Sequence, residues 1–233
     1  MILKKWIDGL LSLLFPQTCV VCGGRLAEGE KYLCIECNMK MPRTHDELHP
    51  DNYMARMLWG RIEIERAGAF FFYSKNNNYK HLLHDLKYHN QKEIGVYIGR
   101  LMSSEIEPSG FFGGIDCLVP VPLHNKRYKK RGYNQSEWIA KGISQITNIP
   151  IDTTSVIRAV NTSTQTKKNA TERAENMKNV FKCIHPEALA KKHILIIDDV
   201  FTTGATTASC AIAIQKSTKT KISIYTMSRV QKA

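Results

Sequence analysis

The stretch 194–206 constrains the fold of this chain more than any other part of it. Four apolar residues, Ile-Leu-Ile-Ile, come first, and Asp198 and Asp199 follow them directly. Such a run is typical of a buried strand in a parallel sheet that is covered on both faces. Because ligands of open α/β sheets bind at the carboxyl ends of the strands, the two acids are predicted to lie at a binding site. Acids that only cap the next helix are the structural alternative.

The residues after the two acids predict a phosphate-binding loop. They are small or carry hydroxyl groups: Thr202, Thr203, Gly204, Ala205 and Thr206. The apolar-periodic segment 205–215 is expected to be a helix, whose first amide groups and dipole favour an anion. Acids beside a phosphate cradle are suited to accept hydrogen bonds from ribose hydroxyl groups, with Mg²⁺ nearby to offset charge. The whole string therefore indicates a site for a sugar phosphate.

The charge of the chain favours an anionic partner. Its formal net charge is +12, from 33 Lys plus Arg and 21 Asp plus Glu. Part of this charge is concentrated in the segment 126–131, whose cations are Lys126, Arg127, Lys129, Lys130 and Arg131. That is more positive charge than one pyrophosphate group requires, which points to a further anion such as nucleic acid. A solvated basic loop would show the same pattern.

The segment 1–15 is expected to be an amphipathic helix. Its apolar residues largely follow helical spacing, and Asp8 interrupts the run that a secretory signal would need. No stretch of the chain approaches the length needed to cross a bilayer. We therefore expect a cytoplasmic protein without a membrane span.

Four cysteines near the amino end have the spacing of a metal site. Cys19-x-x-Cys22 and Cys34-x-x-Cys37 form two pairs that are separated by eleven residues. Four thiolates close a tetrahedral Zn²⁺ site, with iron as the alternative metal. Because such a site leaves no open coordination position, the zinc is expected to be structural. Two disulfides would use the same residues, but a cytoplasmic location argues against them.

Other residues could change this interpretation of the metal site. His45 and His49 follow the four cysteines and are conceivable ligands of an open, catalytic zinc. The remaining cysteines, Cys117, Cys183 and Cys210, are expected to be small buried apolar residues rather than nucleophiles. A closed structural site remains the prediction, because four thiolates fill the tetrahedron unaided.

The composition divides the chain into three parts. Residues 1–45 are expected to hold the amphipathic helix and the four-cysteine module, 46–61 a linker, and 62–233 an α/β domain. Within that domain, strands are predicted at 62–73, 115–121, 194–197 and 222–227, and helices at 79–106, 136–146 and 205–215. This alternation predicts a parallel sheet flanked by helices.

The string 194–206 resembles the signature of the phosphoribosyltransferases, in which two acids and a Thr/Gly-rich loop follow four apolar residues. Further segments resemble the ComF-type competence proteins within that superfamily: Val119-Pro-Val-Pro-Leu-His, Arg131-Gly-Tyr-Asn-Gln, Leu86-Lys87-Tyr88, the polar crossover from Arg158 to Phe181, and the four-cysteine opening. The resemblance spans nearly the whole chain. It implies a type I phosphoribosyltransferase-like sheet with a zinc-ribbon-like module at the amino end.

The resemblance also implies roles for the motif residues. Asp198 and Asp199 would hold the ribose of phosphoribosyl pyrophosphate (PRPP), and the 202–206 loop its 5′-phosphate. Arg127, Lys130 and Arg131 would meet the pyrophosphate together with Mg²⁺, and Lys87 would add a phosphate contact. The crossover from Arg158 to Phe181 would form a hood over the site. If the protein is an enzyme, it would be a phosphoribosyltransferase that displaces pyrophosphate at the anomeric carbon.

The resemblance implies a role in competence, the uptake of DNA in natural transformation. Single-stranded DNA and the helicase or recombination proteins of DNA uptake are the partners that it implies. Tyr128 and Tyr133 interleave the cations of 126–131 as expected stacking surfaces, and Lys167, Lys168 and Arg173 extend the positive charge on the hood. Two hypotheses stay open: a PRPP-binding platform for DNA uptake, and an active transferase of nucleotide or small-molecule metabolism without a DNA role.

Overall fold

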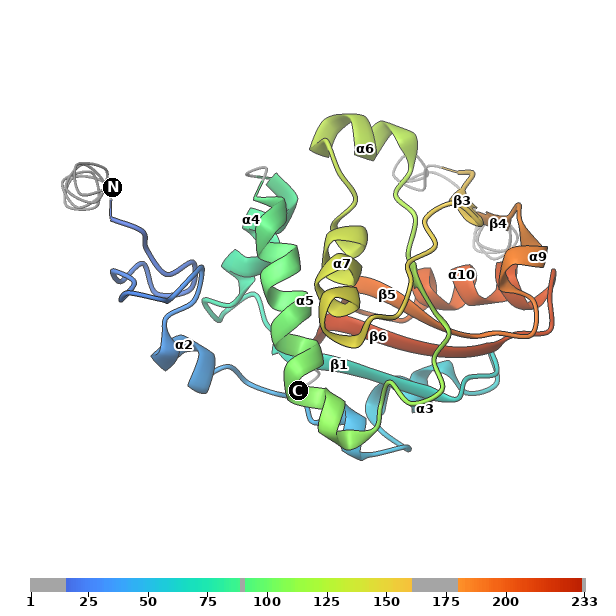
Figure 1. Ribbon diagram of the computed structural model, residues 1–233, viewed down its shortest axis with the longest axis horizontal. Coiled ribbons are helices and arrows are strands. Elements are labelled where there is room, and N and C mark those ends of the chain that lie inside the picture. The colour runs from blue at the N-terminus through green and yellow to red at the C-terminus, as the bar shows by residue number, and fades with distance from the viewer. Residues whose placement is uncertain (1–15, 89–90, 161–179, 232–233) are drawn as a thin grey trace.

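The computed structural model describes residues 16–88, 91–160 and 180–231. Within these residues, four strands form one sheet in the order β1 (Arg66–Tyr73), β6 (Lys221–Val230), β5 (His193–Phe201) and β2 (Cys117–Pro120). Each neighbouring pair in this sheet is parallel. Helices cover the sheet, as Figure 1 shows. The predicted fold class, a parallel α/β sheet flanked by helices, is confirmed.

The side chains of β5 explain why the sheet is covered on both faces. Ile194 and Ile196 belong to one buried apolar cluster and Leu195 and Ile197 to the other. Successive side chains of a strand point to opposite faces, so a strand without polar alternation needs cover on each side. The cluster of Leu195 and Ile197 includes residues of α5 (Lys92–Ile106) and α7 (Gln135–Thr147). The cluster of Ile194 and Ile196 includes residues of α3 (Tyr53–Leu58) and α10 (Ala205–Gln215).

Two glycines let α5 and α7 approach each other closely. A Cβ atom on Gly99 would collide with the carbonyl oxygen of Ile139 in α7, and one on Gly142 would collide with that of Val96 in α5. No side chain can move aside to relieve such a clash with backbone, so the close contact requires glycine at both positions. This contact holds α7, whose first turn reaches the carboxyl end of β5.

The remaining described elements are short. They are α2 (Ile35–Met39), η1 (Asp46–Leu48), α4 (Lys80–Tyr88), η2 (Glu107–Ser109), α6 (Asn125–Arg131), α9 (Pro186–Leu189) and the antiparallel pair β3 (Val156–Arg158) and β4 (Phe181–Cys183). The segment predicted as one helix, 79–106, is thus two helices, α4 and α5. The predicted helix 1–15 and the hood cations Lys167, Lys168 and Arg173 lie outside the described residues.

The segment 46–61, predicted from its polar composition to be a linker, contains helical structure. It holds η1 and α3, and Met54 and Leu58 of α3 are fully buried. The polar residues that suggested a linker lie inside the fold, where they bond to the backbone and to other side chains. The division of the chain at residues 45 and 61 remains a prediction.

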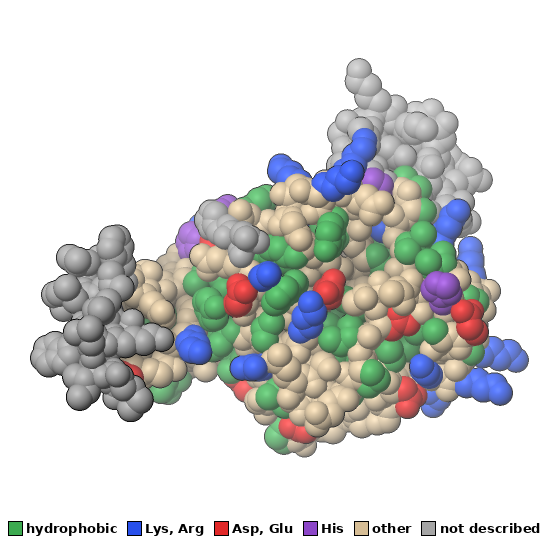
Figure 2. All heavy atoms as spheres, turned by 45° about the horizontal axis from the view of Figure 1, so that its top comes forward, with side chains coloured by type: hydrophobic (Ala, Val, Ile, Leu, Met, Phe, Trp, Pro, Cys, Tyr) green, Lys and Arg blue, Asp and Glu red, His purple; other side chains and the backbone are tan. Residues whose placement is uncertain are grey.

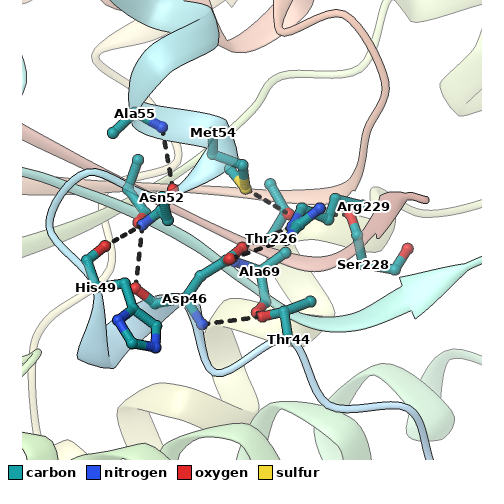
Figure 3. A network of polar contacts seen from close by, with 11 residues as sticks. Thr44, Asp46, His49, Asn52, Met54, Ala55, Ala69, Thr226, Ser228 and Arg229 are labelled. Carbon is teal, nitrogen blue, oxygen red and sulfur yellow. Dashed lines mark hydrogen bonds and ion pairs between the residues drawn. The ribbon is translucent and has the colours of Figure 1, made fainter. Parts of the chain in front are cut away.

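Asp46 and Asn52 are the buried polar residues that anchor this segment (Figure 3). The carboxylate of Asp46 binds Arg229 of β6 through two hydrogen bonds, Nε to Oδ2 at 2.8 Å and Nη2 to Oδ1 at 3.0 Å. The amide of Asn52 donates to the carbonyl oxygens of Ala67 and Asp46, at 2.6 and 3.0 Å, and its Oδ1 accepts from Ala55 at the start of α3. These contacts connect the segment to β1 and β6 of the sheet.

Candidate functional site

Asp198 and Asp199 lie within β5 rather than after it. The strand continues to Phe201, and the two acids are 8% and 9% exposed. The predicted end of the strand at residue 197 was therefore too early, because the pairing with β6 continues on both sides of the acids. Both acids still lie at the carboxyl end of the sheet, where the sequence placed the site.

Asp198 has two hydrogen-bond donors and a raised pKa. Its Oδ1 accepts from the hydroxyl of Ser136 at 3.1 Å and from the amide of Asp199 at 2.9 Å. Burial and the negative charge of Asp199 raise the pKa of Asp198 to about 7. The carboxyl group therefore changes its protonation state close to neutral pH, and a cation bound beside it would favour the charged form.

Asp199 is paired with a lysine from a distant helix. The Nζ atom of Lys87, the penultimate residue of α4, lies 2.7 Å from Oδ2 of Asp199, and both side chains are largely buried. The hydroxyl of Ser228 in β6 donates to the carbonyl oxygen of Asp199 at 3.2 Å. The structure thus brings Lys87 to the acids themselves, whereas the sequence placed it among the phosphate ligands.

The loop after β5 opens into α10 as predicted, with the predicted bounds 205–215. Gly204 has a φ angle of +71°, and a Cβ atom there would lie 2.6 Å from the Phe201 ring. Thr202 and Thr203 are exposed. The guanidinium of Arg61 donates to the carbonyl oxygen of Thr203 at 3.0 Å and so holds the loop from the α3 side. The half-buried start of α10 follows these two exposed threonines, and the start of a helix favours an anion.

The basic segment is a helix rather than the loop that the sequence predicted. In α6, the ring Nδ1 of His124 caps the amide of Lys126, and Gly132 ends the helix with a φ angle of +80°. None of its residues is buried. The histidine cap and the terminal glycine are the start and stop signals of a short helix, which the charge pattern alone does not reveal.

Arg131 is oriented by the first turn of α7 and by α4. Its Nη1 donates to Oε1 of Gln135 at 2.7 Å, and its guanidinium lies 5.7 Å from the centre of the Tyr88 ring. Asn134 caps α7 through its contact with the amide of Ser136. Arg131 is thus held beside the helix that carries the Asp198 partner Ser136.

Arg127 and Lys130 of α6 are related to the acidic site less directly than Arg131 is. Burial lowers the pKa of Arg158 in β3; Arg127 lowers it further and Asp198 acts in the opposite direction. The predicted pyrophosphate ligand Arg127 and the predicted ribose ligand Asp198 therefore both lie near enough to Arg158 to change its pKa. Lys130 is exposed on the surface of α6.

Tyr133 is not a stacking surface. It is 4% exposed, and its hydroxyl donates to the carbonyl oxygen of Leu86 in α4. Tyr128 on α6 is 47% exposed and remains available at the surface. The prediction for Tyr133 was wrong because the chain returns to the core after Gly132, which the charge pattern does not reveal.

Three functional candidates were missed by the sequence analysis. Ser136 and Ser228 contact the two acids, and Arg61 holds the phosphate loop. Serine and arginine at these positions have no local signal, since each is brought to the site by another element. For Ser136, the sequence predicted its position at the start of a helix but no role in the site.

The four cysteines of the amino-terminal module form a compact cluster. Their Sγ atoms all lie within 4.8 Å of one another, and the Sγ atoms of Cys22 and Cys34 are 3.9 Å apart. Zn–S bonds of about 2.3 Å in a tetrahedron require sulfur atoms about 3.8 Å apart, so the residues fit Zn²⁺. The predicted histidine ligands are not part of this cluster.

Backbone amide groups contact the sulfur atoms of the cluster and favour the thiolate form of Cys19, whereas burial raises the pKa of Cys37. The amide of Gly24 donates to Sγ of Cys22, and that of Cys37 donates to Sγ of Cys34, both at 3.4 Å. Burial opposes the ionisation of Cys19, but hydrogen bonds from neighbouring backbone groups, that of Cys22 first, outweigh it and lower its pKa to about 7. A metal cation bound at the cluster would favour the thiolate forms of its cysteines.

The module contacts the α/β domain through its own core and through Arg43. The guanidinium of Arg43 donates to both carboxylate oxygens of Glu105 in α5, at 2.8 and 2.6 Å, and lies 4.3 Å from the centre of the Phe70 ring. The hydroxyl of Tyr79 donates to the carbonyl oxygen of Cys37 at 2.8 Å. The four-cysteine cluster is thereby joined to α5 and to the chain just before α4.

Comparison with known proteins supports the assignment of the four cysteines to a zinc module. Residues 10–48 match the model of the double zinc ribbon domain. A solved structure described as the allosteric regulatory enzyme of purine biosynthesis is 14% identical, with a TM-score of 0.40; the match covers 60% of this chain and 29% of that chain. That likeness is too low to carry an argument. In the part of the chain that the structure describes, no helix is long and apolar enough to cross a membrane.

Three relatives cover much of the chain. The DNA utilization protein YhgH of Salmonella typhimurium is 30% identical over 94% of this chain and 93% of its own length. Competence protein ComFC of Bacillus subtilis is 29% identical over 94% of this chain and 88% of its own. Competence protein F of Haemophilus influenzae is 27% identical over 64% and 66%. With its zinc ribbon and its parallel sheet, this chain belongs to the ComF family of competence and DNA utilization proteins.

Proposed function

We propose that this chain binds PRPP with Mg²⁺ at the carboxyl end of β5 and acts in DNA uptake during competence. One observation carries the proposal. Two buried acids, one of them already paired with a lysine, directly precede a helix that begins at an exposed, glycine-containing loop. Acids suit ribose hydroxyl groups and Mg²⁺, and the start of a helix suits a phosphate.

The ligand would contact three groups of residues. Thr202, Thr203, Gly204, Ala205 and Thr206 would hold the 5′-phosphate through amide and hydroxyl groups. Asp198 and Asp199 would accept hydrogen bonds from the ribose. Arg127, Lys130 and Arg131, together with Lys87 and Mg²⁺, would offset the charge of the pyrophosphate. Mg²⁺ would take carboxylate oxygens of Asp198 or Asp199 as ligands.

The buried ion pair explains how acids and phosphates can share one site. Two negative carboxylates beside a pyrophosphate would repel it strongly in a site of low dielectric constant. The charge of Lys87 and the raised pKa of Asp198 leave the two acids with little net charge before a ligand binds. The approach of an anion therefore costs less than the sequence alone would suggest.

If the protein catalyses transfer, the bond between the anomeric carbon and the pyrophosphate oxygen breaks and a bond to the acceptor forms. The acceptor loses a proton, and pyrophosphate leaves as its magnesium complex. The contribution of the residues would be to orient the ribose and to stabilise charge, because such a reaction needs no protein nucleophile. A platform and an enzyme need nearly the same residues for this binding.

A PRPP titration with Mg²⁺, followed by calorimetry, tests the site. The double variant Asp198→Asn/Asp199→Asn should weaken binding by about 1.5–3 kcal/mol for each charged hydrogen bond lost, and it should keep its fold at a lower stability because Lys87 loses its charged partner. The control Glu28→Gln/Asp51→Asn removes two exposed acids elsewhere and should bind normally. Unchanged affinity in a folded double variant would contradict the site. Release of pyrophosphate with a candidate acceptor would identify an enzyme, and binding without release a platform.

The DNA role is supported by the exposed helix α6 and by the relatives, which are a DNA utilization protein and two competence proteins. Its cations lie on a helix without any buried residue, and Tyr128 adds an exposed ring. Cations that track a backbone and rings on which bases stack are the usual contacts of single-stranded DNA. Neutralising Lys126, Lys129 and Lys130 to Gln should weaken binding of a labelled oligonucleotide and reduce its salt dependence, measured by fluorescence anisotropy. Equal binding by the wild type and this variant at low salt would count against the role of α6.

A further inference from the structure

A basic groove lies at the amino ends of β5 and β6, at the other end of the sheet from the acidic site. The cavity has a volume of about 950 Å³. Four lysines line it, Lys191, Lys192, Lys219 and Lys221, and we call this surface the lysine groove. Lysine and arginine side chains gather at the right-hand edge of Figure 2, the side on which Figure 1 places α9 just before β5.

Backbone hydrogen bonds fix the positions of the four lysines. The turn before β5 and the turn before β6 are joined by two bonds, from the amide of Lys191 to the carbonyl oxygen of Lys219 at 3.0 Å, and from the amide of Lys221 to that of Lys192 at 3.1 Å. The hydroxyl of Thr220 adds a bond to the carbonyl oxygen of Leu189 at 2.9 Å. The lysines are therefore presented by a rigid pair of turns rather than by a loose loop.

The lysine groove keeps positive charges close together with little compensation. All four lysines are exposed. Among the described residues, Lys221 has an ion pair with Glu65, at 3.5 Å, and no ion pair is found for Lys191, Lys192 or Lys219. Like charges on adjacent backbone positions repel each other, and a bound polyanion would remove this cost.

Lys191 adds a second argument. Its φ angle is +62°, in the left-handed region that glycine and asparagine adopt more readily than lysine. The conformation costs free energy that a glycine would avoid. The backbone conformation of the turn therefore does not select lysine at this position.

The rest of the lining indicates which polyanion fits. Ile62 and Ile64 are half-buried and line the cavity with Ile222, which gives the groove an apolar part. Glu63 and Glu65 lie on the same segment as Ile62 and Ile64 and would repel phosphates from that side. Among the described residues no aromatic ring lines the groove, so its lysines would supply the electrostatic part of single-strand binding, and the apolar faces of unpaired bases would contact the isoleucines.

We propose that the lysine groove binds single-stranded DNA through its phosphates. It lies at the amino ends of β5 and β6, whereas the acids and the phosphate loop lie at the carboxyl end of β5. The groove is therefore a second contact surface, and its occupation does not require the PRPP site. A strand held by both α6 and the groove would contact two sides of the molecule.

Fluorescence anisotropy with a labelled single-stranded oligonucleotide tests this proposal. The triple variant Lys191→Asn/Lys192→Gln/Lys219→Gln should bind about tenfold or more weakly at low salt. The slope of log K against log salt should become shallower by about two, since each lost phosphate contact contributes about 0.7 for a single strand. The asparagine suits the left-handed backbone at position 191, so the fold should be retained; a melting curve checks this, and Lys192→Gln/Lys219→Gln replaces the triple variant if it fails.

A matched control separates the groove from net charge. The variant Lys31→Gln/Lys40→Gln/Lys75→Gln removes three exposed lysines elsewhere on the molecule and should change binding far less. Equal losses in the two variants, or an unchanged salt slope in the groove variant, would overturn the proposal. An equal loss for duplex DNA would overturn the assignment to single strands. PRPP binding by the groove variant should stay normal, so failure of this proposal leaves the proposed function untouched.

Discussion

The zinc ribbon closes within the segment from Cys19 to Cys37, whereas the acidic site at the carboxyl end of β5 joins residues from four elements. Lys87 comes from α4, Ser136 from α7 and Ser228 from β6, and all three meet Asp198 or Asp199 of β5. The ribbon needs a metal to satisfy its thiolates, and the acidic site needs the surrounding sheet and helices to satisfy its carboxylates. A local pattern of ligands is therefore visible in the sequence, and a site assembled over long range is visible only in part.

The zinc ribbon also packs against α5 of the α/β domain. Cys19, Val21, Leu33 and Met41 of the module belong to the same buried cluster as residues of α5. Arg43 adds a two-point ion pair with Glu105. The ribbon therefore depends on its metal for its internal structure and on α5 for its position.

Metal removal is expected to have the largest effect. A strong chelator, or Cys22→Ser, should release one Zn²⁺ per chain and unfold residues 17–40, because structural zinc contributes about 10–16 kcal/mol to folding in comparable peptides. Elemental analysis and hydrogen exchange measure the two effects. Cys183→Ser, which changes a cysteine outside the cluster, should retain the metal. A metal-free protein with a protected amino end would show that the ribbon does not depend on zinc as we describe.

Breaking the Asp46–Arg229 pair is expected to have the next largest effect. Asp46→Asn leaves the guanidinium of Arg229 without its two-point partner in a largely buried place, which should lower the free energy of unfolding by about 3–5 kcal/mol. Urea unfolding measures it. The exposed pair Glu36–Lys40 supplies the control, since Glu36→Gln should leave the free energy of unfolding almost unchanged. Equal effects of the two substitutions would show that the segment 46–61 is held less firmly than its contacts indicate.

A pH dependence of stability that comes from Asp198 is expected to be comparable to or smaller than the effect of Asp46→Asn. Its pKa in the folded protein, about 7, lies above that of an unfolded aspartate, about 3.9, so the folded state binds more protons between these values. Its contribution to stability is therefore fully present below pH 4 and is lost as the pH rises through 7. Urea unfolding at several pH values should show this loss in the wild type and not in Asp198→Asn. The same slope in both proteins would place the proton elsewhere.

Local patterns determined several features of the fold correctly. The apolar run before Asp198 predicted a buried strand, and the periodicity of residues 205–215 predicted α10 with its observed bounds. The spacing of the cysteines predicted a cluster that the structure shows. These predictions succeed because helix periodicity, strand burial and knuckle spacing are set by residues close together in the chain.

Tertiary structure alone decided the features that sequence analysis missed or placed wrongly. Asp46 and Asn52 look like linker residues until the sheet supplies partners for their polar atoms. Tyr133 looks like part of a basic surface until α4 covers it, and the pairing of Lys87 with Asp199 appears only once α4 is placed beside β5. A buried polar group is stable only where its partners are, and those partners come from segments distant in sequence. The residue types were therefore readable from the chain, while their pairings required the fold.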